Sequence, residues 1–271
     1  NHEFSEHGFK QSRIEARFIA EHILKCDYSR ILAGLAPNPT PEQSLIALKI
    51  LNARLAGKPL AHILGYTDFY GLRFKVTPGV LVPRPETEIL VETALKILQT
   101  KNTNSTWILD LYTGCGNILL SIISNMPQIH GAGIDIDPVS ISYAETNRES
   151  LKIRNAVFTL GRVSDILGKL DNRFNLITAN PPYIPSAEID TLESEVKNAE
   201  NRDALDGGED GLDEIRIISE LAKNALTDDG VLLCEIGAGQ SDSVRDLFSH
   251  WSLVLFGKDY LNHDRILVAH V

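Results

Sequence analysis

The chain has 271 residues, of which 43% are hydrophobic and 23% are charged, a composition that is typical of a globular protein and excludes a disordered chain, a collagen and a coiled coil. Its net charge of −10 is unevenly placed: residues 1–90 carry 11 basic and 9 acidic side chains, and residues 91–271 carry 15 and 27. Because residues 91–271 are so acidic, we do not expect binding along a nucleic-acid backbone to be the main function.

The sequence also bears on compartment and metal binding. No apolar run approaches the roughly 20 residues of a membrane span, and residues 1–10 are polar, without the apolar core of a signal peptide. The three cysteines, Cys26, Cys115 and Cys234, are far apart, and the eight histidines show no ligand pairing. We therefore expect a cytoplasmic protein that has no disulfide framework, no metal site and no contact with membranes.

Residues 1–65 are expected to form a helical domain, because apolar residues recur in them at helical spacing. Prolines between Pro37 and Pro41 interrupt the helices, and Pro41 is well placed to begin the next helix. Residues 66–84 have a different character, with aromatic and β-branched residues around turn residues such as Gly71. This pattern predicts a β-hairpin that links two domains.

The third part, residues 85–271, alternates between apolar strands and helical segments. Such alternation predicts a mainly parallel sheet with helices on both faces. The last two strands have no helix between them, so one of them is expected to run antiparallel. Strands are expected at residues 107–111, 131–136, 156–160, 174–178, 230–236, 253–256 and 265–269, and helices at residues 85–98, 118–123, 138–151, 212–226 and 241–248.

A loop with two glycines, Tyr112–Gly116, follows the first of these strands and precedes a helix. Glycines there let the backbone turn sharply and approach a ligand closely. About 20 residues later Asp135 ends the second strand, where an acid can hold ribose hydroxyls. The third glycine of the dinucleotide fingerprint is absent. Asp110, just before the loop, is unfavourable beside a pyrophosphate but suits a cofactor with a positive charge, such as the amino group of S-adenosylmethionine.

A second motif, Asn180-Pro181-Pro182-Tyr183, follows the fourth strand at the expected carboxyl edge of the sheet. The Asn180 side-chain oxygen and a proline carbonyl can together accept both hydrogens of a planar NH2 group, and Tyr183 offers a flat face for stacking. An amide or aminopurine nitrogen is a poor nucleophile, because its lone pair is delocalised. Two acceptors return electron density to that nitrogen and orient it toward a sulfonium methyl, without a metal or a covalent nucleophile.

These residues resemble the class I S-adenosylmethionine-dependent methyltransferases, and more narrowly the protein-(glutamine-N5) methyltransferases that modify peptide chain release factors. The resemblance extends over nearly the whole chain. Besides the Asn-Pro-Pro-Tyr motif, which DNA adenine-N6 methyltransferases share, it is carried by five segments. These segments are His62–Gly65, Phe69–Leu72, Val82–Glu88, Ala204–Asp213 and Glu235–Gly237 with Gln240.

The resemblance implies a Rossmann-like α/β domain with a seven-stranded, mostly parallel sheet at residues 85–271, a substrate-binding helical domain at residues 1–65 and a linking hairpin at residues 66–84. It implies transfer of a methyl group from S-adenosylmethionine, which becomes S-adenosylhomocysteine, to the glutamine of the Gly-Gly-Gln motif of release factors. The protein would act as a monomer, without direct nucleic-acid binding.

The resemblance also implies the site residues. Asn180, Pro181, Pro182 and Tyr183 would hold the substrate glutamine and form the catalytic motif. The cofactor would be contacted by Asp110, Tyr112, Thr113, Gly114, Cys115, Gly116, Asp135, Ile136, Asp165, Ile166 and Asn180.

Four positions depart from the family pattern: Tyr112, Ile166, Cys115, where a small polar residue is common, and Asn201, which follows Glu200 where Glu-Pro is usual. Tyr112 stands where the family usually has glycine, and since tyrosine does not easily adopt a positive φ, the loop is expected to be reshaped or its site partly filled. Ile166 stands where an aromatic residue often packs on the adenine. The role of Arg84 stays open between anchoring the hairpin and meeting the substrate, and the acidic loop 203–213 is either solvated or faces the substrate.

Three alternative functions remain. A paralogous enzyme that methylates a glutamine of a ribosomal protein fits the same motifs. A DNA adenine-N6 methyltransferase should carry a basic target-recognition region, which the acidic residues 91–271 do not offer. An inactive cofactor-binding partner is favoured only by Tyr112, and the intact Asn180–Tyr183 motif argues against it.

Overall fold

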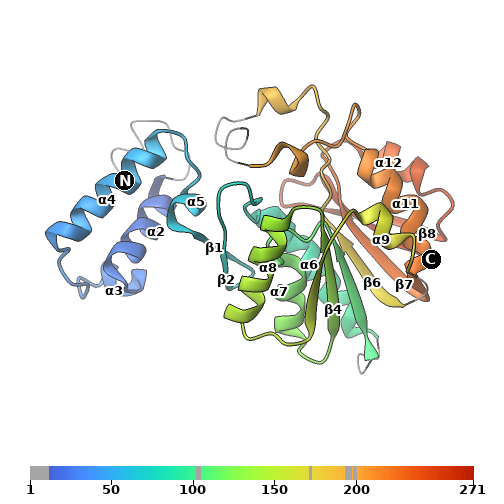
Figure 1. The fold of residues 1–271 in the computed structure, drawn as a ribbon, viewed down its shortest axis with the longest axis horizontal. Helices are drawn as coiled ribbons and strands as arrows, with labels where there is room; N and C mark the ends of the chain where they lie inside the picture. Colours follow the sequence, from blue (N-terminus) through green and yellow to red (C-terminus); the bar gives the residue numbers. More distant parts are fainter. Residues whose placement is uncertain (1–11, 102–104, 171–172, 193–196, 198–199) are drawn as a thin grey trace.

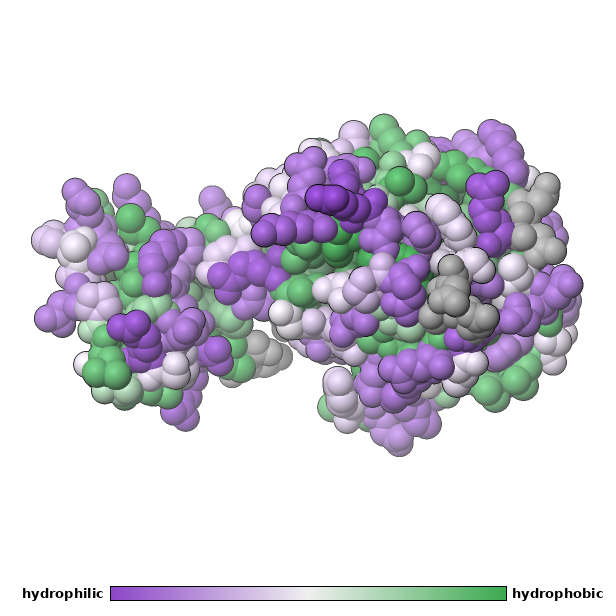
Figure 2. Space-filling view, turned by 90° about the horizontal axis from the view of Figure 1, so that it is seen from below, coloured by the Kyte–Doolittle hydropathy of each residue, from purple (hydrophilic) through white to green (hydrophobic). Residues whose placement is uncertain are grey.

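The computed structural model describes residues 12–101, 105–170, 173–192, 197 and 200–271, so the polar residues 1–10 lie outside the described part (Figure 1). The described part of the N-terminal lobe contains four helices, as the sequence pattern predicts: α2 (Ser12–Leu24), α3 (Tyr28–Leu32), α4 (Pro41–Leu55) and α5 (Leu60–Leu64). The lobe projects from the larger part of the molecule, and apolar and polar side chains are interspersed on the face that Figure 2 shows. None of the described helices combines the length and the apolar character needed to cross a bilayer.

The start of α4 follows directly from its sequence. The Thr40 side chain accepts from the Gln43 backbone N–H, the Gln43 side chain accepts from the Thr40 N–H, and Pro41 occupies the first helical turn. Farther along α4, the buried Arg54 donates to both carboxylate oxygens of Glu15 on α2, at 2.7 and 2.9 Å. This bidentate ion pair joins the two longest helices of the lobe.

The expected hairpin consists of β1 (Tyr66–Phe69) and β2 (Leu72–Lys75), joined by a two-residue turn in which Tyr70 (φ 49°) and Gly71 (φ 74°) both have positive φ. Its apolar residues belong to the core of the larger domain: Phe69 and Phe74 are buried in one cluster with apolar residues of α6 (Glu88–Gln99) and α7 (Asn117–Asn125). Glu88 at the start of α6 accepts from the Tyr70 N–H at 2.8 Å. The hairpin is thus packed on the sheet domain rather than suspended between two bodies.

The larger domain is built on a seven-stranded sheet with the order β5-β4-β3-β6-β7-β9-β8. All neighbours are parallel except that β9 runs antiparallel to β7 and β8, as expected from the missing helix between the last two strands. Its strands are β3 (Trp107–Leu111), β4 (His130–Asp135), β5 (Ala156–Leu160), β6 (Phe174–Ala179), β7 (Leu226–Glu235), β8 (Leu253–Lys258) and β9 (Asp264–His270).

Helices cover both faces of the sheet (Figure 1). One face packs against α6 (Glu88–Gln99), α7 (Asn117–Asn125) and α8 (Pro138–Ser150), and the other against α9 (Val163–Leu167), α11 (Asp213–Ala225) and α12 (Ser241–Leu247). Successive strand residues enter opposite cores, since Ile108 lies in the first and Leu109 in the second. Short 3₁₀ turns occur at Pro85–Thr87, Ile189–Thr191 and Arg202–Ala204.

The differences from the sequence pattern are local. The helix expected from residue 85 begins with the 3₁₀ turn Pro85–Thr87, and β7 begins at Leu226 rather than at residue 230, with a register shift where it pairs with β6. Helix α9 has only 5 residues, too few for an apolar repeat to reveal it.

The sheet topology also places the motifs. The chain order reverses around β3, which lies between β4 and β6, and the carboxyl ends of β3 and β6 are adjacent, with Leu111 opposite Ala179. Ligands of open α/β sheets bind at such a switch point. The glycine loop after β3 and the Asn-Pro-Pro-Tyr motif after β6 therefore lie side by side.

Candidate active site

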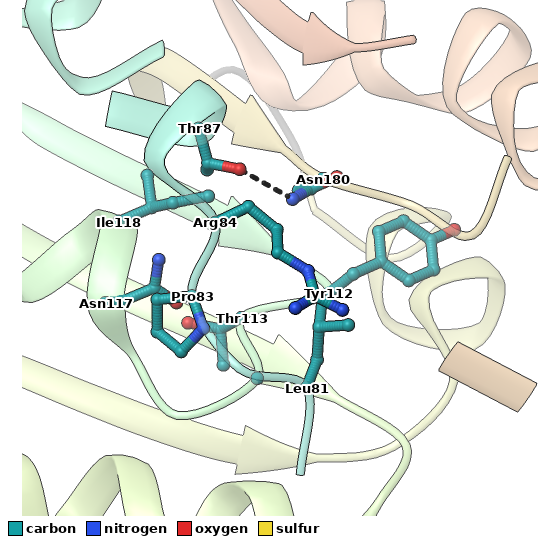
Figure 3. A pocket seen from close by; sticks show the side chains of 10 residues that line it. Leu81, Pro83, Arg84, Thr87, Tyr112, Thr113, Asn117, Ile118 and Asn180 are labelled. Atoms are coloured by element: carbon teal, nitrogen blue, oxygen red, sulfur yellow. Dashed lines mark hydrogen bonds between the residues drawn. The ribbon is translucent and has the colours of Figure 1, made fainter. Parts of the chain in front are cut away.

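A cavity of about 320 Å³, including space open to solvent, lies at this switch point. Three segments form its walls: the stretch that enters α6, the loop after β3 with the start of α7, and the residue that follows β6 (Figure 3). The lining residues are Leu81, Pro83, Arg84, Thr87, Tyr112, Thr113, Gly114, Asn117, Ile118 and Asn180.

The loop after β3 needs both of its glycines. Gly114 (φ 53°) and Gly116 (φ 81°) have left-handed backbones, and Gly116 is the N-cap of α7. A Cβ on Gly116 would lie 3.0 Å from the Phe158 ring, so a larger residue there would crowd that ring besides having an unfavourable φ. The Gly116 N–H donates to the Thr113 carbonyl at 2.8 Å, which closes the turn.

Tyr112 corrects the expectation that a tyrosine would avoid positive φ and reshape the loop. Its φ is 57°, in the region where glycine is usual, and its ring points away from Asn117 and Ile118 (Figure 3). The phenol donates to the Glu214 carboxylate at 2.5 Å, and burial raises the pKa of Tyr112, so the phenol remains a donor. A left-handed conformation costs about 1–2 kcal/mol. A hydrogen bond to a charged group contributes about 1.5–3 kcal/mol and offsets that strain.

Asp110 lies in a different environment from the one its motif suggests. The side chain is fully buried and does not line the cavity. Its two oxygens accept from Thr113 Oγ1 at 2.6 Å and from Thr178 Oγ1 at 2.7 Å. The structure thus does not bring the Asp110 carboxylate out to meet a cationic group. The Asp110 carboxylate instead connects the end of β3 to the following loop, through Thr113, and to β6, through Thr178.

The buried Asp110 predicts a pH dependence of stability. Burial raises its pKa from 3.8 to about 7, so between these values the folded protein keeps a proton that the unfolded chain has released. The free energy of unfolding should therefore fall as pH rises from about 4 to about 7, by up to about 4 kcal/mol. Asp110→Asn should lose this contribution. Denaturant unfolding of both proteins at several pH values measures it, and parallel pH profiles would contradict the prediction.

Asp135, Ile136 and Ile166 do not line the cavity; Asp135 and Ile136 lie at the end of β4, and Ile166 lies on α9, which follows β5. Asp135 ends β4, and its carboxylate accepts from the Gly114 N–H at 2.8 Å and from the Asp137 N–H at 2.9 Å. Burial raises the pKa of Asp135, while these two backbone donors lower it. Ile136 is exposed, and Ile166 packs over Gly161 after β5. The exposed Asp165 lies beside Ile166 on α9.

The Asn-Pro-Pro-Tyr motif is held from several sides. Asn180 is half-buried, and its side-chain Nδ2 donates to Thr87 Oγ1 at 3.4 Å. Pro181 is buried and Pro182 half-buried. The Tyr183 phenol donates to Glu235 at 3.1 Å, and Gln240 Nε2 donates to the Tyr183 carbonyl at 3.0 Å.

The acidic loop 203–213 packs against this motif through two of its glycines. A Cβ on Gly207 would lie 2.8 Å from the Pro182 carbonyl, and one on Gly211 would lie 2.4 Å from the Tyr183 carbonyl. Both glycines are therefore required by close backbone contact rather than by solvent exposure. The Asp210 carboxylate is held within the loop region by Arg216.

Several residues at the site have roles that the sequence pattern did not reveal. Arg84 donates to the buried Glu200 at 2.7 Å, so Arg84 anchors the segment that enters α6, although it also lines the cavity. Thr87, Glu235 and Arg265 lie far apart in the sequence yet form a connected group around Asn180 and Tyr183. Within the described ranges, no three His, Cys, Asp or Glu side chains gather closely enough to hold a metal ion.

Comparison with known proteins places this geometry in a class. Residues 102–252 match a family model described as a methyltransferase domain, and residues 1–65 match one described as the PrmC N-terminal domain. The putative methyltransferase yhhF from Escherichia coli shares the fold, with a TM-score of 0.50 and 17% identity over 74% of this chain and 92% of its own. The fold and the family match define a class I S-adenosylmethionine-dependent methyltransferase.

Two curated relatives narrow the class. The release factor glutamine methyltransferase of Thermodesulfovibrio yellowstonii is 38% identical over 257 residues, which cover 94% of this chain and 91% of the relative. The release factor glutamine methyltransferase of Geobacter sulfurreducens is 36% identical, over 90% of this chain and 84% of the relative. The chain belongs to the family of release factor glutamine methyltransferases, and the family and fold predicted from the sequence are confirmed.

Proposed function

We propose that this protein transfers a methyl group from S-adenosylmethionine to the side-chain amide nitrogen, N5, of the glutamine in the Gly-Gly-Gln motif of peptide chain release factors. The observation that carries the proposal is the position of Asn180. Its side chain lines the cavity at the end of β6, and its NH2 group is engaged by Thr87, which leaves the carbonyl oxygen to accept from a substrate amide. The relatives named for this activity support the choice of substrate.

The residues beside the cavity fit the proposed cofactor. Space is open in front of Gly114, where no atom lies within 4 Å of a would-be Cβ. Each Asp135 oxygen accepts one backbone N–H, and a carboxylate oxygen can accept a further hydrogen from a ribose hydroxyl. Ile136 and Ile166 offer apolar contact for an adenine. We propose that these residues and the 112–116 loop hold the cofactor, with Asp110 supporting the loop from behind.

Methyl transfer to the amide requires the protein mainly to position the substrate amide. When bound, the cofactor supplies a methyl group on a positively charged sulfur. The Asn180 oxygen and the Pro181 carbonyl accept the two hydrogens of the glutamine amide, which raises electron density on its nitrogen and fixes its direction. Tyr183 and Pro182 shape the slot for the planar amide. A hydrogen-bonded amide held in line in this way needs no covalent intermediate.

We further propose that residues 1–65 bind the release factor, that residues 66–84 link them to the catalytic domain of residues 85–271, and that the protein acts as a monomer in the cytoplasm. The surface of the helical lobe supports the first part. Six large apolar side chains are exposed there, a feature common on protein-binding surfaces. They are Ile14, Leu32, Leu35, Leu45, Ile46 and Leu48.

The proposal is tested by transfer of labelled methyl from S-adenosylmethionine to a purified release factor, beside a release factor whose Gly-Gly-Gln glutamine is replaced by alanine. Label on the unaltered substrate alone is the expected result. Label on neither would overturn the proposal, and ribosomal proteins and adenine-containing DNA would then be offered in turn. A calorimetric titration with the cofactor would identify an inactive cofactor-binding protein.

A further inference from the structure

A chain of hydrogen bonds runs from Asn180 into the protein interior. Asn180 Nδ2 lies 3.4 Å from Thr87 Oγ1, and Thr87 Oγ1 lies 2.7 Å from Glu235 Oε2. The other Glu235 oxygen accepts from the Tyr183 phenol at 3.1 Å. Arg265 donates to the Tyr183 phenol at 3.2 Å and lies 3.5 Å from Glu235. The dashed line in Figure 3 marks the outer link of this chain.

The chemistry of these side chains fixes which group donates and which accepts in each hydrogen bond. A carboxylate has no hydrogen to donate, so at 2.7 Å the single hydroxyl hydrogen of Thr87 must point to Glu235. Thr87 Oγ1 can then only accept on its other side. The Asn180 amide must therefore turn its NH2 group to Thr87 and its oxygen toward the cavity.

The direction depends on Glu235 carrying its charge. Thr87 and Glu235 are 1% and 2% exposed, so water does not compete with the chain of bonds. Burial raises the pKa of Glu235, whereas the hydrogen bond from Thr87 and the charge of Arg265 favour the ionised form. Arg265 also lies over the Tyr183 ring, with its guanidinium carbon 5.4 Å from the ring centre. The Arg265 cation thus holds two acceptors in place, the Tyr183 phenol oxygen and the Glu235 carboxylate.

We propose that Thr87 and Glu235 are positioning residues that set which way the Asn180 amide faces. This inference rests on the proposed function, since it concerns how Asn180 receives a substrate amide. If the Asn180 amide were reversed, its NH2 group would meet the NH2 group of the substrate, donor against donor. Thr87 lines the cavity, but its hydroxyl hydrogen points away from it to the buried Glu235, so the role assigned to both residues is exerted on the Asn180 amide.

Two substitutions change the hydrogen bonds between Asn180, Thr87 and Glu235 in different ways. Thr87→Val keeps the shape of the side chain but breaks the link. Glu235→Gln reverses it: Tyr183 donates to one side of residue 235, where the Arg265 cation also lies, and both attract the glutamine oxygen, which turns its NH2 group to Thr87. The Thr87 hydrogen is then released to Asn180, whose oxygen is drawn away from the cavity. Only Thr87→Val leaves a buried carboxylate oxygen, Glu235 Oε2, without its donor. If that variant misfolds, Glu235→Gln still tests the proposal.

The experiment measures kcat, KM for the release factor and the calorimetric Kd for S-adenosylmethionine. Both variants should lower kcat by about tenfold or more with the Kd for the cofactor unchanged, and Thr87→Ser, which keeps the hydroxyl, should regain most of the activity lost in Thr87→Val. In an Asn180→Ala background neither substitution should lower kcat by more than about twofold, because the two residues act through one group. Thr93→Val is the matched control, since Thr93 Oγ1 donates only to Ile89 O within α6.

The outcomes separate this inference from the function on which it rests. An inactive unsubstituted protein would be a failure of the proposed function. Full activity in both variants, with an active unsubstituted protein, would overturn the positioning role alone. An equal loss of kcat with and without Asn180 would also overturn it, because the two residues would then act on something other than the amide.

Discussion

Asn180→Ala should lower kcat for methyl transfer to a release factor by a factor of about 10² or more, as the loss of a positioned acceptor does in other active sites. The substitution removes the one side-chain oxygen that lines the cavity from the end of β6. Single-turnover transfer of labelled methyl measures the effect without interference from product release. Near-normal turnover would contradict the proposed mechanism.

The fold should survive this substitution. Asn180 is half-buried, and its one side-chain hydrogen bond, to Thr87, is 3.4 Å long. The cofactor Kd and the thermal midpoint should therefore stay close to those of the unsubstituted protein. A large drop in the thermal midpoint would instead assign the loss of activity to unfolding.

Asp135→Ala should weaken binding of S-adenosylmethionine by about 10- to 100-fold, because a hydrogen bond to a charged group contributes about 1.5–3 kcal/mol. Two contributions are lost together. One is the acceptor proposed for the ribose hydroxyls, and the other is the acceptor that holds the Gly114 N–H and so shapes the loop. Isothermal titration calorimetry with the cofactor gives the Kd directly. An unchanged Kd would remove Asp135 from the proposed site.

A neighbouring acid provides the control for charge alone. Asp137 caps α8, accepting from the Val139 and Ser140 N–H groups. Asp137→Asn keeps the cap, since asparagine is as good an N-cap residue, but removes one negative charge close to Asp135. Its Kd should stay within about twofold of the unsubstituted value, because a charge screened by water contributes little. A loss as large as that of Asp135→Ala would indicate a general field effect instead.

The two substitutions should separate binding from chemistry. Asp135 lies at the end of β4, which β3 separates from β6, and its carboxylate accepts from the Gly114 N–H, whereas Asn180 follows β6 with its amide on Thr87. Asp135→Ala is therefore expected to raise the cofactor concentration needed for half-maximal rate. Asn180→Ala is expected to lower the rate at saturating cofactor.

Much of the fold could be predicted from the sequence because its signals are local. Apolar periodicity marked the strands and helices, and the missing helix between the last two strands predicted the antiparallel β9. The short helix α9 and the early start of β7 were not predicted, because five residues carry no periodicity and a bulge depends on the partner strand. The hairpin was predicted as a linker, yet Phe69 and Phe74 belong to the core of the sheet domain.

The same distinction between local and long-range signals applies to the residues of the candidate site. Asn180 could be found because its chemistry is carried by four adjacent residues, and the loop at residues 112–116 because glycine spacing reports backbone shape. Asp110 could not be oriented from sequence, because the partners of its carboxylate include Thr178 on another strand. Tyr112 was expected to distort the loop, but Glu214, distant in the chain, accepts its phenol and offsets the strain.

The sequence by itself determined the class of fold and the family, and it supplied the residues proposed to meet the substrate, because these depend on side-chain types at short spacings along the chain. Only the tertiary structure decided how those residues are held. Thr87, Glu235 and Arg265 come together from the 3₁₀ turn Pro85–Thr87, β7 and β9, and their contacts exist only once the sheet has formed. A hydrogen bond takes its direction from its partner, and no pattern along the chain specifies a partner that folding alone brings near.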